Sequence, residues 1–133
     1  MKTIFTKIAS ILAFIIGGMA VIAGAQVLLG DDPGYYVINW LPIYNYTIGI
    51  LTVFITSIFI FTNSRFALPT AIGTFSLHAL VMLILQITYR NIVAPDSIRA
   101  MTIRLIVWAL ILGLMFIQSH KNKKMQYLNS PSL

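Results

Sequence analysis

The sequence contains no cysteine and few charges of either sign. Without thiols, the chain can form neither a disulfide bond nor a thiolate metal site. Charged residues make up 9% of the 133 residues and hydrophobic residues 59%, with a mean hydropathy of +0.90. A soluble domain of this size could not hide so much apolar surface inside itself. The composition therefore excludes a globular protein dissolved in water and predicts an integral membrane protein.

Four long apolar stretches predict four transmembrane helices. Each stretch is near or above the roughly 20 residues with which a helix crosses the apolar part of a bilayer. We place the helices at Ile8–Leu29, Ile43–Thr62, Leu68–Tyr89 and Ser97–Gln118. The expected fold is an all-α four-helix bundle, a single membrane domain over residues 1–133. An outer loop at 30–42 and a basic cytoplasmic tail at 119–133 complete it.

Basic residues are unevenly distributed between the two ends of these helices, and the net charge is +6. By the positive-inside rule, the end rich in Lys and Arg faces the cytoplasm. Six basic residues share that end: Lys2, Lys7, Arg65, Lys121, Lys123 and Lys124. We therefore expect both termini to be cytoplasmic in a multi-pass protein of the cell membrane, of the bacterial inner-membrane type. The tail has an alternative role as a contact for anionic lipid.

The first apolar segment has two interpretations. Its basic start and its small-residue ending at Ala23, Gly24 and Ala25 are typical of a cleaved secretory signal peptide. The apolar run is longer than the about 7–15 residues of such a signal, which favours a retained helix. A retained helix would present a stripe of small residues to another helix, of the same chain or of a second copy. This small-residue stripe consists of Ala9, Ala13, Gly17, Ala20 and Gly24.

Polar side chains within the expected helices form a candidate intramembrane site. His78 lies near the middle of its helix, where a polar group needs a partner. We expect a hydrogen bond from His78 to a threonine or asparagine of the second helix, with a proton relay and haem ligation as alternatives. The candidate site consists of His78, Arg104, Gln86, Asn45, Thr52 and Thr56.

Arg104 places a charge inside the last apolar segment. One explanation is that its long side chain reaches up to the outer membrane surface. The other is an ion pair with an acid of the outer loop, for which Asp31 and Asp32 are better placed than Asp96. Binding of a substrate anion, or gating, is a third possibility. The expected outer charge cluster consists of Asp31, Asp32, Arg90, Asp96 and Arg99.

The outer loop gathers several tyrosines and a tryptophan around Asp-Pro-Gly and Pro42. Such side chains favour the membrane interface, so the loop is either an aromatic belt or a lid over an outward-facing cavity. A hydrolase or transferase needs a nucleophile, a base and an orienting group within reach, and one buried histidine does not supply that set. We therefore expect no enzyme and no cofactor or metal.

Two classes of function remain. The first is a small non-catalytic subunit or accessory component of a membrane assembly. The alternative is a small transporter or channel with a polar path past His78 and Arg104, and haem binding comes third. The expected partners are the lipid bilayer and either copies of the chain or a larger membrane complex. A nucleic-acid partner is excluded, because no folded basic surface would carry it.

The charge distribution makes a testable prediction about topology. A reporter that is active only in the cytoplasm, fused after Leu133, should be active, because the positive charges hold that end inside. The same reporter fused after Asp32 should be silent and serves as the control. Activity at Asp32 with silence at Leu133 would contradict the predicted orientation.

Overall fold

The computed structural model describes residues 3–129, and this part of the chain is all-helical. The elements are α1 (Ile4–Leu28), α2 (Leu41–Leu51), η1 (Thr52–Thr56), α3 (Ser57–Phe61), α4 (Ala67–Ile87) and α5 (Pro95–Asn129). The elements α2, η1 and α3 follow one another without a break, so Leu41–Phe61 is one long helix with a π-helical turn in its middle. The structure thus has four helices that are long and apolar enough to span a membrane, as the sequence predicts.

The bounds differ most from expectation at the end of the last helix. We expected a tail after Gln118, but α5 continues to Asn129. Residues 119–129 contain neither proline nor glycine, and lysine, glutamine and leucine are good helix formers, so nothing ends the helix at that point. Residues 1–2 and 130–133, which include Lys2 and the end of the expected tail, lie outside the described residues.

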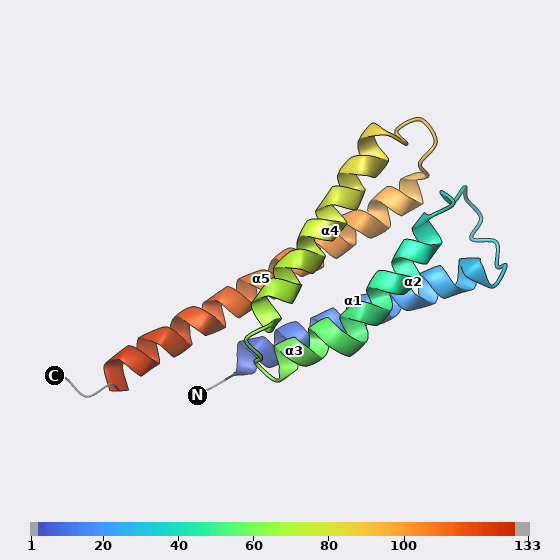
Figure 1. The fold of residues 1–133 in the computed structure, drawn as a ribbon. Coiled ribbons are helices and arrows are strands. Elements are labelled where there is room, and N and C mark those ends of the chain that lie inside the picture. Colours follow the sequence, from blue (N-terminus) through green and yellow to red (C-terminus); the bar gives the residue numbers. More distant parts are fainter. Residues whose placement is uncertain (1–2, 130–133) are drawn as a thin grey trace.

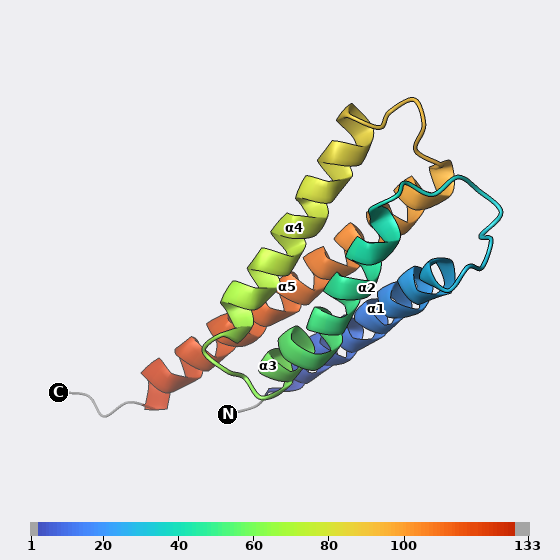
Figure 2. The same cartoon turned by 45° about the vertical axis from the view of Figure 1, so that its right-hand side comes forward.

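The four long helices form two antiparallel hairpins (Figures 1 and 2). The helix Leu41–Phe61 folds back on α1, and α5 folds back on α4. The start of α1 and the end of α5 lie at the same end of the bundle, which we call the termini end (Figure 1). Loops 29–40 and 88–94 lie at the other end, which we call the loop end. The hairpins meet mainly where α1 packs on α5, while α4 touches the first hairpin through η1 and α3.

The small-residue stripe of α1 packs inside the chain. A Cβ atom on Gly17 would lie 2.9 Å from the side chain of Thr52, and one on Gly49 would lie 2.7 Å from the backbone of Gly17. A Cβ atom on Gly24 would lie 2.6 Å from the backbone nitrogen of Tyr46. These separations are too short for any side chain, so α1 and α2 touch backbone to backbone. The partner of the stripe is therefore the second long helix of the same chain.

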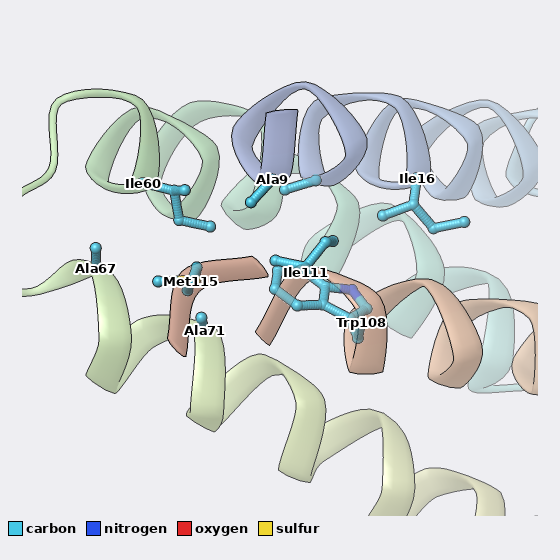
Figure 3. Close-up of a cluster of buried hydrophobic side chains, with 9 residues drawn as sticks. Ala9, Ile16, Ile60, Ala67, Ala71, Trp108, Ile111 and Met115 are labelled. Carbon is cyan, nitrogen blue, oxygen red and sulfur yellow. The ribbon is translucent and has the colours of Figure 1, made fainter. Parts of the chain in front are cut away.

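Two hydrophobic clusters fill the space between the hairpins. The first lies toward the termini end and joins α1, α3, α4 and α5 (Figure 3). Its largest side chain is Trp108, which is fully buried. The second lies at the loop end and joins the loop, α2, α4 and α5 through Ile38, Leu41, Leu85 and Met101. The second cluster supports the polar groups described below.

The contact between α1 and α2 makes a prediction about adjacent glycines. Gly17→Leu should destabilise the protein by about 3 kcal/mol or more, at the upper end of the cost of overpacking, because even its Cβ atom would lie 2.9 Å from the buried, β-branched side chain of Thr52. Gly18→Leu is the matched control, since a Cβ atom there would meet nothing within 4 Å. Unfolding of both variants in mild detergent measures the difference. Equal stability of the two variants would show that the close helix contact does not form.

Candidate functional site

His78 is held by an aromatic residue of α2 rather than by the expected threonine or asparagine. Its side chain is 3% exposed, and its Nδ1 atom lies 2.6 Å from the hydroxyl oxygen of Tyr44. In a neutral imidazole that carries its proton on Nε2, the Tyr44 hydroxyl donates this hydrogen bond. The two rings meet edge to face with centroids 5.8 Å apart, and the Trp108 ring lies 6.4 Å from the His78 ring. His78 thus joins α4 to α2 and α5.

Tyr44 is the site residue that the sequence analysis missed, since it was counted among the aromatic side chains around the membrane interface. A signal was available: Tyr44 lies at the start of the second span, one residue before Asn45, and a phenol can donate and accept hydrogen bonds. Trp40 behaves in the same way. Its Nε1 atom donates to the hydroxyl oxygen of Tyr89 at 3.0 Å, so it also joins the two hairpins.

These aromatic contacts occur where α2 and α4 are not in close backbone contact. The Trp40 ring lies 5.9 Å from the Tyr89 ring and 6.5 Å from the Tyr44 ring, both edge on. Edge-to-face pairs of this kind contribute about 0.5–1.5 kcal/mol each beyond the burial of their area. Large side chains therefore fill the wider space at the loop end. Tyr35, Tyr36 and Tyr46 remain exposed.

Arg104 is buried in the bundle, with 6% of its surface exposed. Its Nη1 atom donates to the Oδ1 atom of Asn45 at 2.5 Å and lies 3.6 Å from the Sδ atom of Met101. Neither leading expectation holds, because the side chain does not reach the surface and its described partners are neutral. Asp31 and Asp32 are exposed in the loop, which passes over the end of the bundle. The oxygen that accepts from Arg104 is instead that of Asn45, in α2.

The other residues of the candidate site lie apart from these two pairs. Thr52 is buried and donates to the carbonyl oxygen of Ile48 in its own helix at 2.7 Å. Thr56 is buried in the π-helical turn, and Gln86 is exposed on α4. The structure therefore brings His78 to Tyr44 and Arg104 to Asn45, but it does not join the six residues in one site.

The expected outer charge cluster lies at the loop end, and all five of its residues are exposed. The Oδ1 atom of Asp32 accepts a hydrogen bond from the backbone nitrogen of Gly34 at 2.9 Å, which shapes the turn. Asp96 lies in the first turn of α5, where a carboxylate interacts favourably with the helix dipole. These residues are solvated ends of helices and loops and do not form a closed site.

Two adjoining pockets lie beneath the long loop. The smaller, about 60 Å³, lies between α1, α2, the loop and α5, and its polar lining includes Arg104, Asn45, Ser97 and Tyr35. The larger, about 380 Å³, is lined by Gln26, Asp31, Asp32 and Pro33 among others. The pockets share three lining residues: Ala23, Val27 and Tyr35. Together they place one buried cation and two carboxylates around neighbouring pockets.

The two histidines of the chain lie in different parts of the fold. Between residues 3 and 129, no three His, Asp or Glu side chains are grouped so that they could hold a metal ion. His78 is buried inside the bundle, whereas His120 is exposed on the extension of α5 toward the termini end. One iron atom could not take both histidines of a single chain.

The contact between His78 and Tyr44 predicts an energetic coupling. Tyr44→Phe removes the hydroxyl and leaves the Nδ1 atom of His78 without its partner, so it should cost about 1–3 kcal/mol. A double-mutant cycle with His78→Phe should show a coupling of about 0.6–1.7 kcal/mol, from the average to the largest value measured for hydrogen bonds between helices in a membrane protein. Tyr46→Phe is the control, because Tyr46 is exposed. Additive effects of the two substitutions would contradict the hydrogen bond.

Comparisons of the chain with protein-family models, with curated proteins and with solved structures found no match. Four apolar helices are compatible with a small membrane protein.

Proposed function

We propose that the chain is a non-catalytic subunit or accessory component of a membrane assembly. We further propose that it lies in a bacterial inner membrane, with the loop end outside and both termini in the cytoplasm. The basic residues of the termini end support this orientation. The proposed partner is another membrane helix, from a copy of this chain or from a larger complex.

The observation that carries this proposal is the outward surface of α4. The glycines that pack closely in this chain, at positions 17, 24 and 49, lie between α1 and α2. On α4, in contrast, a Cβ atom on Gly73 would meet nothing within 4 Å. Ser76 and Leu80 are exposed on the same face, at spacings of three and seven residues. Small residues on an apolar helix surface allow a second helix to approach closely, which drives association in lipid.

The position of α4 in the bundle also supports the proposal that its outward face binds a partner helix. This helix lies on the outside of α5 and has few backbone contacts with the first hairpin (Figure 2). Its far side is therefore open along the whole length of the span. A helix that docks there would meet Gly73 and Ser76 near the middle of α4.

A transporter or channel has weaker support. A transport path would need several polar side chains that line one cavity. His78 and Tyr44 instead form a hydrogen bond with each other inside the bundle. Thr52 bonds within its own helix, and Gln86 lies on the surface. The pocket at Arg104 is confined to the loop end, and the first hydrophobic cluster fills the bundle toward the termini end.

A photo-crosslinking amino acid at Leu80 tests the proposed surface. It should form an adduct with a membrane protein in intact membranes, and Gly73→Leu should lower the adduct yield about tenfold, as a loss of about 1.4 kcal/mol of association free energy would do. Gly18→Leu, on the open side of α1, should leave the yield unchanged. An adduct with lipid alone, or equal yields in both glycine variants, would overturn the proposal.

A further inference from the structure

The guanidinium group of Arg104 is a buried cation without a described counter-charge. The chain contains three acidic residues, Asp31, Asp32 and Asp96, and all three are exposed at the loop end. The contacts of Arg104 are an amide oxygen and a thioether sulfur, both neutral. Burial of an uncompensated charge is strongly unfavourable, so such a group is found with an anion or on a functional path.

The geometry leaves part of the guanidinium group for a ligand. Both described contacts use the same nitrogen atom, Nη1, so the donors on Nη2 and Nε remain. The smaller pocket lies against Arg104, and its lining also includes Ser97 and Tyr35. Its volume of about 60 Å³ suits a group as small as a carboxylate. The planar fork of an arginine matches a carboxylate with two parallel hydrogen bonds.

The adjoining pocket has the opposite charge. Asp31 and Asp32 line it, and three further residues line both this pocket and the pocket at Arg104. A molecule that placed a carboxylate at Arg104 would extend toward these two aspartates, where a positive group would be favoured and a second negative group repelled. The two pockets together are therefore complementary to a small zwitterion.

We propose that the two adjoining pockets beneath the long loop together bind a small aminocarboxylate, with its carboxylate against Arg104 and its ammonium group toward Asp31 and Asp32. The bound carboxylate neutralises the buried guanidinium, and Asn45, which also lines the smaller pocket, holds the guanidinium in position through Nη1. The exposed loop, with Tyr35 lining both pockets, covers the ligand. This site does not depend on the proposed assembly and would be present in a single chain.

Binding to the full chain in mild detergent tests the proposal with a series of defined probes. Glycine, β-alanine and 4-aminobutyrate separate the carboxylate from the ammonium group by increasing lengths, and acetate and propionate lack the ammonium group. At least one aminocarboxylate should raise the melting temperature and bind about tenfold more tightly than the simple acids, as a favourable contact to the aspartates predicts. The titrations are followed by calorimetry.

Variants assign the two ends of the ligand. Arg104→Gln should abolish binding of all probes, whereas the double variant Asp31→Asn with Asp32→Asn should bind the simple acids normally and lose the preference for the ammonium group. Ala23→Leu leaves every charge in place and fills the space shared by the pockets, so it should also abolish binding. Ala109→Leu, an exposed alanine that lines neither pocket, is its control and should bind as the wild type does.

Several outcomes would overturn the proposal. These are no binding of any aminocarboxylate to the wild-type chain, unchanged binding in Arg104→Gln or Ala23→Leu, and stabilisation by phosphatidylethanolamine alone, which would assign the pocket to a lipid headgroup. If Arg104→Gln does not fold, the pair Ala23→Leu and Ala109→Leu still decides the result, because neither changes the buried charge.

Discussion

The close contact between α1 and α2 is the constraint on which the rest of the structure depends. Gly17 and Gly49 bring the two helices together backbone to backbone, which leaves no room for a side chain between them. In lipid the helices gain little from hydrophobic contrast, so close packing of this kind is a main source of their association. The first hairpin is therefore a closely packed unit, and α5 packs against its α1 side.

At the loop end the backbone of the second hairpin lies farther from the first hairpin, and large side chains fill the space between them. Trp40 and Tyr44 extend from the first hairpin to Tyr89 and His78 on the second. Each pair combines a hydrogen bond with an edge-to-face ring contact, so it satisfies a polar group and fills space at once. The Trp108 ring packs beside the His78 ring. Its Nε1 atom is buried without a hydrogen-bond partner among the described residues. That donor carries an energetic cost, which the burial of a whole indole ring offsets.

The polar groups inside the bundle separate into two sets with different consequences. His78 is buried and hydrogen-bonded to Tyr44, so its polar ring becomes part of the packing. Arg104 keeps its charge, and Asn45 supplies only a dipole in return. A charge that is held by a single amide at the edge of a pocket is the least satisfied feature of the bundle, and for this reason the proposed ligand site is placed there. The exposed face of α4, with Gly73, is a separate feature and supports a partner helix.

The sequence alone determined the number of helices, their approximate positions and their all-α class, because about 20 consecutive apolar residues specify a span whatever its neighbours are. It also identified the small-residue stripe and the two residues whose placement inside a membrane is energetically unfavourable, His78 and Arg104. Only the tertiary structure decided their partners. Periodicity along one helix does not say which helix lies opposite, so Tyr44 was assigned to the interface and Asp31 or Asp32 to Arg104. The register of α2 against α4 and α5 instead places a phenol at His78 and an amide at Arg104, since contacts between distant segments depend on how the hairpins pack.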